Sequence, residues 1–596
     1  MPAQDTISRL DTRSLSSRCS VCLDLNLSEE KWFSSAAPDV WRTSALECES
    51  CAVVLQVVEP FLSKTRHLYF FEKDLLIRIF LSHGGIFLFE LLKPKRPRLE
   101  RIQEGEIRCD VDGACPWPSI KPECLGLQNA KFASSRIMQW MKQCEGRHDT
   151  CTRGIGLQEL PTRVIEIQRP GRIRLVATEK GQQGLYACLS HCWGGIEILR
   201  TTKSTYLDFQ KTIPWNDVPP TFKHALEVTW ETGIRYLWID SLCIVQDDSA
   251  DWRHEGSKMA SIYSHSYFTL AAVASRNAHD GLYRRSRQNN YFEHDMQRRS
   301  DQAAYKLYVR PTDKHDQFDT LEMPLFKRAW FFQERFLSNR VVFFGSEELY
   351  WECCELRCCE CGGLPGTVTA DNRHPSKLKM PKDITGWHIL VSQYTKLHLT
   401  FQTDKLPALQ GLAKAWQQTL QGNYLAGLWR GHILNDLMWK VQVPLPRPRV
   451  YLGPSWSWVS TDSPVTWNSH YTGSHRKAVS IISISTTPAG RDPMGDITSG
   501  ELVLKGQCVR ATTKHHELQP ESSAFRSSPR RWYPDAPTTA FNNVLLIEMT
   551  SDSYLSWCLV LRQKPGQNAA YERIGHAPFY GRGFGQYAEE MVITVV

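Results

Sequence analysis

The stretch of sequence that decides the fold is Tyr186-Ala187-Cys188-Leu189-Ser190-His191-Cys192-Trp193-Gly194-Gly195. Its first five residues are a short, mainly apolar run, which predicts a buried strand that ends at Ser190. Apolar side chains then recur at helical spacing over residues 221–232, and Gly233 can adopt the positive φ that often ends a helix. A second apolar run over residues 235–240 predicts the next strand. Strand, helix and strand in this order indicate a βαβ unit.

The same alternation continues on both sides of this unit. A helix is predicted to begin near Ser249, and residues 267–273 form a third apolar run. Upstream, residues 163–167 and 172–176 are strand-like segments around a turn at Pro170-Gly171, which is a hairpin signal. We therefore expect an α/β fold in which helices flank a mostly parallel sheet.

The loops that follow the predicted strands are where we expect the functional site. In a parallel α/β sheet, ligands bind in the crevice beyond the carboxyl ends of the strands. Three segments directly follow the three strands, at residues 190–195, 240–246 and 275–280. Asp240 ends its strand at this edge. It either binds a ribose or a cation, or it caps a loop by accepting backbone N–H bonds.

Composition excludes several classes of protein. The chain has 596 residues, of which 42% are hydrophobic and 11% aromatic, so it is too apolar for a disordered protein. A net charge of +8 is too dilute over this length to indicate a specific nucleic-acid partner. The apolar runs are shorter than the ~20 residues of a membrane span, and residues 1–18 lack the apolar core of a signal peptide. We therefore expect a cytoplasmic protein whose cysteines are thiols or metal ligands more often than disulfides.

The chain is predicted to divide into five segments. They are residues 1–17, which are disordered; 18–155, a cysteine-rich N-terminal region; 160–345, the α/β domain; 346–380, a cysteine-rich variable loop; and 381–596, a mixed α+β C-terminal region. Residues 93–125 carry Pro, Gly and charge, which predicts a linker or a long loop. Residues 281–320 are polar and basic, and we expect them to be an insertion.

Two pairs of cysteines near the N-terminus have the spacing of a metal site. Cys19 and Cys22 form one Cys-x2-Cys knuckle, and Cys48 and Cys51 form another. Two such knuckles complete a tetrahedral, closed four-thiolate site for structural Zn²⁺. The gap of 25 residues between them is slightly longer than the usual ~15–20. The alternative is four thiols without a metal.

Two further groups of cysteines are weaker signals. Cys144, His148 and Cys151 offer three ligands, and either Cys124 or Cys115 could supply a fourth. A dense group further along the chain is predicted to be a variable loop, with a metal or redox role as the alternative. Its members are Cys353, Cys354, Cys358, Cys359 and Cys361.

Four ordered blocks of this sequence resemble the fungal heterokaryon incompatibility (HET) domain. The blocks are Tyr186–Gly194, Leu237–Asp247, Met259 with Ile262-Tyr263, and Arg328–Glu334. Residues 404–413 and 454–458 resemble segments that often follow this domain. The resemblance implies self/non-self recognition and programmed cell death after hyphal fusion, in the cytoplasm of an ascomycete. It also implies that the chain works through a protein partner or through self-association.

HET domains are in turn similar to TIR domains, which are flavodoxin-like α/β modules, and some TIR domains cleave NAD. In the TIR pattern a Trp precedes a catalytic Glu by a few residues, and the matching positions are Trp330 and Glu334. The resemblance thus implies that Glu334 is catalytic and that NAD is the substrate. A carboxylate beside the ribose stabilises the oxocarbenium-like state through which such a bond breaks.

Seven further residues are candidates for the pocket or its motifs. They are Ser190, His191, Trp193, Gly194, Asp240, Trp330 and Gln333. His191 and the adjacent Cys192 do not form a catalytic dyad, because neighbours along a strand point to opposite sides. The alternative for the helical pair is structural: Trp330 belongs to the core, and Glu334 pairs with Arg328 or Arg335. An enzyme requires Glu334, Asp240 and residues 190–195 to converge on one pocket.

Overall fold

The computed structural model describes most of the chain. The described residues are 19–25, 33–66, 75–81, 87–95, 98–110, 115–117, 120, 129–152, 156–283, 292–298, 301–311, 323–346, 348–360, 381–420, 422–467, 476–490, 492–514, 516–520, 530–537, 540–551, 555–564, 570–580, 584 and 588–596. The predicted disordered segment 1–17 and residues 361–380 of the predicted variable loop lie outside these ranges. Three large sheets of six, eight and ten strands organise the described residues.

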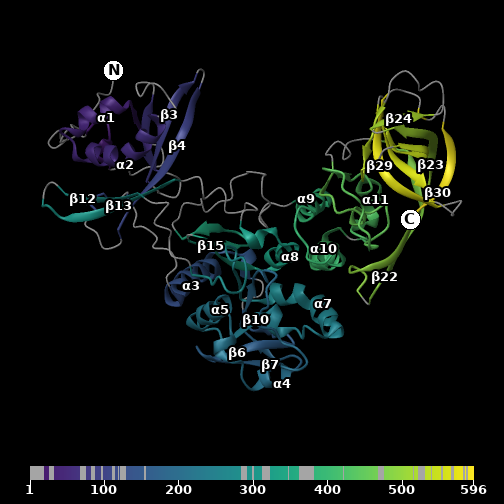
Figure 1. Ribbon diagram of the computed structural model, residues 1–596, viewed down its shortest axis with the longest axis horizontal. Coiled ribbons are helices and arrows are strands. Elements are labelled where there is room, and N and C mark those ends of the chain that lie inside the picture. Colours follow the sequence, from purple (N-terminus) through teal and green to yellow (C-terminus); the bar gives the residue numbers. More distant parts are fainter. Residues whose placement is uncertain are drawn as a thin grey trace, which may run out of the picture.

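The central sheet has eight strands in the order β16-β15-β14-β11-β9-β10-β6-β7 (Figure 1). They are β6 (Arg163–Arg169), β7 (Arg172–Ala177), β9 (Tyr186–Ser190), β10 (Tyr236–Ile239), β11 (Phe268–Ala271), β14 (Arg340–Phe344), β15 (Leu349–Cys353) and β16 (Arg357–Cys359). β14, β11, β9 and β10 are parallel neighbours, and antiparallel strands extend the sheet at both edges. The sheet is therefore mixed rather than mostly parallel, because a hairpin connection at each edge adds antiparallel strands.

Helices cover both faces of this sheet (Figure 1). α5 (Pro220–Glu231) connects β9 to β10 and packs with α3 (Ala130–Arg147). α7 (Ser249–His265) connects β10 to β11 and packs with α8 (Ala329–Leu337). Because crossover connections are right-handed, connections that run in opposite directions across the sheet put their helices on opposite faces. The two pairs of helices therefore enclose the parallel strands.

The predicted end of the helix at Gly233 and the predicted start of a helix near Ser249 are confirmed. Gly233 has φ 81° just after α5. The side chain of Asp248 caps α7 by accepting hydrogen bonds from the backbone of Ala250 and Asp251. Two short helices complete the segment, α4 (Tyr206–Lys211) and α6 (Asp240–Cys243). Counted along the chain, the four parallel strands have the spatial order 2-1-3-4, since β10 lies on one side of β9 and β11 and β14 lie on the other.

The N-terminal sheet has six strands in the order β1-β2-β3-β4-β13-β12. They are β1 (Phe33–Ala36), β2 (Leu76–Leu81), β3 (Phe87–Lys95), β4 (Arg98–Cys109), β12 (Phe292–Gln297) and β13 (Ala304–Pro311). α1 (Pro38–Ala45) and α2 (Glu49–Arg66) belong to the same region, and a hydrophobic core of its own lies between these elements.

The prediction of a linker or loop over residues 93–125 is wrong at its start. β3 extends to Lys95, and the charged stretch 98–109 forms the long strand β4, which pairs with β3 and β13. Buried Glu106 and Arg108 form an ion pair with each other, so a polar sequence forms a central strand. The expected insertion contributes β12 and β13 to this sheet rather than to the central one.

The C-terminal part combines helices with a large, mainly antiparallel sheet. The helices are α9 (Ile384–Tyr394), α10 (Pro407–Leu420) and α11 (Ile433–Asp436). The ten-strand sheet contains β21 (Arg476–Lys477), β22 (Val479–Pro488), β23 (Ile497–Lys514), β24 (Glu517–Pro520), β25 (Arg530–Arg531), β26 (Tyr533–Pro534), β27 (Ala540–Ser551), β28 (Leu555–Gln563), β29 (Ala570–Tyr580) and β30 (Glu589–Val595). β23 pairs with both β27 and β30, so five strands close into a ring. None of the described helices combines the length and apolar character that a membrane span requires.

Candidate functional site

Buried polar side chains gather where β9 and β10 end. Every residue of β9 is buried, and Ser190 and His191 at its carboxyl end are 1% and 2% exposed. Among the described residues, both ring nitrogens of His191 have no hydrogen-bond partner. The nearest carboxylate oxygen to His191 Nδ1 is Asp240 Oδ1, at 3.7 Å, from the end of β10. The predicted crevice edge therefore holds an imidazole whose two ring nitrogens form no hydrogen bond.

Asp240 joins the loops that follow the two strands. Its Oδ2 accepts a hydrogen bond from Trp193 Nε1 at 3.0 Å, and its Oδ1 accepts one from the backbone N–H of Ser241 at 2.7 Å. Asp240 therefore caps a loop, which is one of the two roles that the sequence allows for it. Burial lowers the pKa of His191 to about 4 although Asp240 opposes the shift, so the imidazole beside Asp240 is neutral at pH 7.

Glu334 projects from α8 toward the same edge of the sheet. Glu334 is buried, with only 6% of the residue exposed. Burial raises the pKa of Glu334 to about 7, and the hydroxyls of Ser190 and Tyr263 and the guanidinium of Arg328 limit the rise. Asp240 adds a like charge that also raises the pKa. Glu334, Asp240 and Ser190 therefore belong to one electrostatically coupled cluster.

The structural alternative, an ion pair of Glu334 with Arg328 or Arg335, is not found among the described residues. Arg335 instead pairs with Glu352 of β15, with 2.7 Å between Nε and Oε2. Arg328 donates a hydrogen bond to the carbonyl oxygen of His191. Among the described residues, no cation lies within 4.0 Å of the Glu334 carboxylate. Glu334 is thus a buried carboxyl group without an ion-pair partner, which is the environment that tunes a carboxyl for proton transfer near neutral pH.

Trp330, one turn before Glu334, faces a different environment. Its Nε1 donates a hydrogen bond to Asp404 Oδ2 at 3.1 Å, and its ring packs edge-on against Trp252 at 6.3 Å. Both rings line a cavity of about 750 Å³ that also contacts Pro407 of α10. Glu334 is not among the described residues that line it. Trp330 and Glu334 therefore do not line this cavity together.

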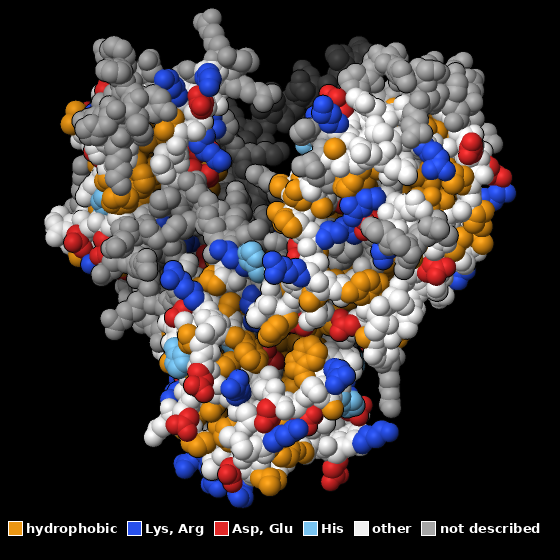
Figure 2. Space-filling model, turned by 45° about the vertical axis from the view of Figure 1, so that its right-hand side comes forward, with side chains coloured by type: hydrophobic (Ala, Val, Ile, Leu, Met, Phe, Trp, Pro, Cys, Tyr) orange, Lys and Arg blue, Asp and Glu red, His pale blue; other side chains and the backbone are white. Residues whose placement is uncertain are grey.

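Figure 2 shows one face of the molecule, on which hydrophobic side chains gather near the centre. On that face, basic side chains are interspersed with acidic ones rather than collected into a patch.

Gln333 and Gly194 serve close packing. Gln333 Oε1 accepts a hydrogen bond from the backbone N–H of Gly411 at 2.6 Å, which joins α8 to α10. Gly194 has φ 76°, and a Cβ at this position would lie 2.3 Å from the Cβ of Asn277. Only glycine therefore allows the loop after β9 to contact the loop after β11. A Cβ at Gly195 would meet no atom within 4 Å, so its side of the loop is open.

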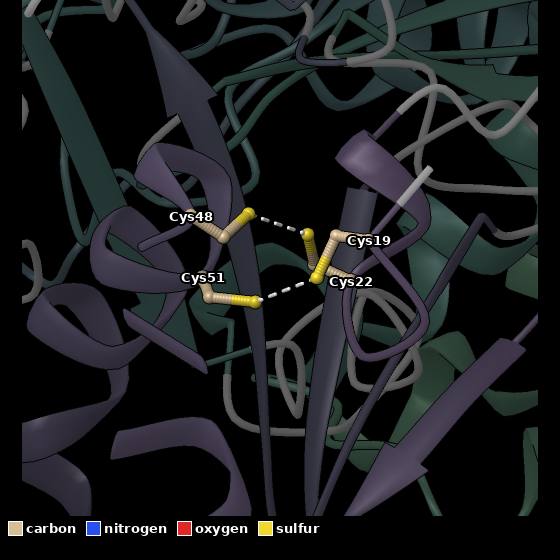
Figure 3. Close-up of side chains that lie close together, drawn as sticks. All are labelled: Cys19, Cys22, Cys48 and Cys51. Atoms are coloured by element: carbon tan, nitrogen blue, oxygen red, sulfur yellow. Dashed lines mark hydrogen bonds between the residues drawn. The ribbon is translucent and has the colours of Figure 1, made fainter. Parts of the chain in front are cut away.

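The four cysteines of the N-terminal knuckles converge (Figure 3). Cys19 and Cys22 precede a short helical turn, and Cys48 and Cys51 lie where α1 gives way to α2. The Sγ atoms of Cys19 and Cys51 are 3.6 Å apart, those of Cys22 and Cys48 are 3.4 Å apart, and all four lie within 4.8 Å of one another. Zn–S bonds of about 2.3 Å put tetrahedral sulfurs about 3.8 Å apart. The cluster can hold a metal ion, and its geometry is compatible with structural zinc.

Replacement of Cys48 by Ser is expected to remove one zinc ion per chain, because a three-thiolate remnant binds the ion much more weakly. The measurement is elemental analysis of the purified full-length protein. Cys115→Ser is the matched control, since Cys115 is a half-buried thiol of the same region outside the cluster. Equal zinc contents in wild type and Cys48→Ser would mean that these cysteines are only thiols.

A second cluster contains Cys144, His148 and Cys151 as expected, but its fourth member is Cys353. Cys124 lies outside the described residues. Cys353 and Cys359 lie on β15 and β16, so the expected loop does not hold for this part of the chain. Cys361 also lies outside the described residues.

The central part of the chain matches a known family. Residues 186–334 match the family model described as heterokaryon incompatibility protein (HET). The chain carries a HET domain. The match begins at the first residue of β9 and ends at Glu334, so it spans the connections between β9, β10 and β11 together with the polar cluster. It covers about a quarter of the chain and connects it with heterokaryon incompatibility. No curated protein and no solved structure matches the chain significantly.

Two residues near Glu334 were not predicted as site residues from the sequence. Tyr263 comes from α7 and Arg328 directly precedes α8, and both lower the pKa of the Glu334 carboxyl group. Both lie inside the blocks that carried the resemblance, which was the available signal. Burial also decides against Cys192 as a nucleophile in the HET domain, because it raises the pKa of this thiol to about 11.

Proposed function

We propose that this protein is an effector of fungal heterokaryon incompatibility whose HET domain triggers programmed cell death. The match of residues 186–334 to the HET family carries this proposal. The domain acts through assembly or signalling, either with a protein partner or with a second copy of the chain, in the cytoplasm. The close contact of α8 with α10 through Gln333 and Gly411 supports a mechanism in which the C-terminal part influences the HET domain directly.

A second candidate function is cleavage of the nicotinamide–ribose bond of NAD by the HET domain. The observation that favours it is the buried Glu334, which interacts with Ser190 and Asp240 and forms no ion pair among the described residues. His191, next to Ser190, has two ring nitrogens without a hydrogen-bond partner. The strand order 2-1-3-4 also agrees with the flavodoxin-like order, in which ligands bind at the switch between the first and third strands. Those strands are β9 and β11, and Ser190 ends β9.

In this candidate mechanism each group has a defined role. The Glu334 carboxylate stabilises positive charge that develops on the ribose and holds its hydroxyls. With a pKa of about 7, roughly half of the molecules carry the charged form at neutral pH. Contact of the ribose with Ser190 and neutral His191 requires the site to open, because these residues are only 1% and 2% exposed. Trp330 does not stack the base, because it lines the other cavity.

The test is expression of the full-length wild type, Glu334→Ala and Glu334→Gln in a fungal host, with viability and NAD followed together. Glu231→Ala is the control, since Glu231 is exposed at the end of α5. The effector proposal predicts that wild type and Glu231→Ala kill the host, and it is wrong if neither does. Protein levels measured by immunoblot separate loss of function from loss of protein.

The NAD measurement separates the two candidate functions. If NAD falls before viability in wild type and stays constant with both Glu334 variants at equal protein level, the HET domain is an NAD-cleaving enzyme. If wild type kills while NAD remains constant, the enzymatic candidate is rejected and assembly or signalling is retained.

A further inference from the structure

Four metal-binding side chains from two distant parts of the chain meet beside the central sheet. Cys144 lies in the last turns of α3, His148 follows that helix directly, and Cys151 lies in the next short turn. Cys353 comes from the end of β15, about 200 residues further along the chain. All four ligand atoms lie within 4.8 Å of one another. The cysteines are buried, and His148 is partly exposed.

The distances agree with a tetrahedral zinc site. Cys353 Sγ lies 3.3 Å from His148 Nδ1, and Cys151 Sγ lies 3.8 Å from the same nitrogen. Zn–S bonds of about 2.3 Å and Zn–N bonds of about 2.0–2.1 Å put sulfur and nitrogen about 3.6 Å apart. Cys144 and His148 are four residues apart, so both side chains lie on one face at the end of α3. Three thiolates and one imidazole are a ligand set typical of structural zinc.

Arg340 provides an independent argument for charge at this cluster. The residue is 0% exposed on β14, and its Nε donates a hydrogen bond to Cys144 Sγ at 3.4 Å. Its other nitrogens donate to the carbonyl oxygens of Cys151, at 2.9 Å, and Tyr267, at 3.3 Å. Among the described residues it forms no ion pair with a carboxylate. A buried guanidinium without a counter-charge is strongly unfavourable.

A bound zinc ion resolves this imbalance. Three thiolates and a neutral imidazole around Zn²⁺ carry a net charge of −1, which is opposite to the charge of Arg340, the donor of a hydrogen bond to Cys144 Sγ. Neutral thiols would leave the Arg340 guanidinium with no anion among its hydrogen-bond acceptors. Three thiolates without a metal would leave excess negative charge in a buried site. The surrounding loop is also held in place, because Glu355 accepts hydrogen bonds from the backbone N–H and the hydroxyl of Thr150, both at 2.6 Å.

We propose that Cys144, His148, Cys151 and Cys353 bind a structural Zn²⁺ ion that fastens α3 to the edge of the central sheet, with Arg340 as its counter-charge. The site is distinct from the N-terminal knuckles and from the Glu334 cluster, and it does not depend on the proposed function. It joins α3, which precedes the HET domain, to β15, the second strand after it. Removal of the metal releases α3 from β15.

The first test measures zinc per chain in the full-length protein. Wild type is expected to hold two ions, one in each cluster, and Cys353→Ser is expected to hold one. Cys354→Ser is the matched control, because Cys354 is the adjacent residue and lies outside the four ligands. The double variant Cys48→Ser/Cys353→Ser is expected to hold none. The proposal is overturned if Cys353→Ser retains as much zinc as wild type, or if Cys354→Ser loses an ion instead.

A second test needs no substitution, so it remains decisive if the variants fail to fold. Thiol labelling of wild type, located by mass spectrometry, is compared before and after treatment with a chelator. Cys144, Cys151 and Cys353 are expected to be protected before treatment and labelled after it, while Cys188 inside the central sheet stays protected. Hydrogen exchange of α3 is expected to rise in parallel. Equal labelling of the three cysteines before and after metal removal would refute the site.

Discussion

Replacement of Glu106 by Gln is expected to lower the free energy of unfolding of the N-terminal sheet by about 3–5 kcal/mol. Glu106 is 1% exposed on β4 and contacts two buried guanidinium groups. Arg108 contacts it from the same strand, and Arg310 of β13 donates a hydrogen bond to its Oε2 at 2.8 Å. The substitution removes the negative charge that faces both buried guanidinium groups. It also replaces one of the two acceptor oxygens with an NH2 donor that points at a cation. Breaking a buried ion pair from one side is among the costliest single changes in a protein.

Hydrogen exchange resolved by peptide locates this effect. Amides of residues 98–110 and 304–311 are expected to exchange faster in Glu106→Gln, while those of residues 340–344 in the central sheet stay protected. Glu100→Gln is the control on the same strand, because Glu100 pairs with Lys95 at the surface and its loss is expected to change stability by less than about 0.5 kcal/mol. If Glu106→Gln and Glu100→Gln lower the free energy of unfolding by similar amounts, the buried carboxylate contributes no more than the exposed one.

Replacement of Glu334 by Gln is expected to stabilise the HET domain relative to wild type as pH rises. The difference in the free energy of unfolding between variant and wild type is expected to grow by about 2.5 kcal/mol from pH 5 to pH 8. Burial raises the pKa of Glu334 from 4.5 to about 7. Below pH 4.5 the group is protonated in both the folded and the unfolded state, so it has no effect. Between pH 4.5 and 7 the unfolded state loses its proton first, and the folded wild type is progressively destabilised. The glutamine does not titrate and avoids this loss.

The measurement is urea-dependent hydrogen exchange of peptides from β9 and β10, at pH 5 and pH 8. Groups that titrate elsewhere cancel in the difference between wild type and variant, because both proteins contain them. Glu231→Gln serves as the exposed control and is expected to follow wild type at both pH values. A difference between wild type and Glu334→Gln that is the same at pH 5 and pH 8 would contradict a carboxyl that titrates near neutrality.

Much of the central domain follows from local patterns in the sequence. Hydrophobic runs at the strand and helix periods predicted β9, α5, β10, α7 and β11, and the turn at Pro170-Gly171 predicted the β6–β7 hairpin. The two Cys-x2-Cys knuckles were also recognised from spacing alone. These features depend on residues that are close in the chain, where side-chain period and turn chemistry decide the structure.

Contacts between distant segments were not accessible in this way. The charged stretch 98–109 has the composition of a loop, yet it forms a strand because Arg310, from a segment far along the chain, neutralises Glu106. The environment of Glu334 likewise depends on Tyr263 and Arg328, and no spacing rule places these groups beside it. Burial, which sets the pKa of Glu334, is a property of the packed structure alone.

The sequence by itself therefore determined the βαβ core, the HET domain and one of the two cysteine clusters. Only the tertiary structure decided which residue completes the other cluster, because Cys144 and Cys353 approach each other only after α3 packs against β15. It also decided that Trp330 and Glu334 face different surroundings although they lie one turn apart on α8. The physical reason is the same in both cases: ligand sets and charge environments arise from the order in which strands and helices pack, and a local pattern does not encode that order.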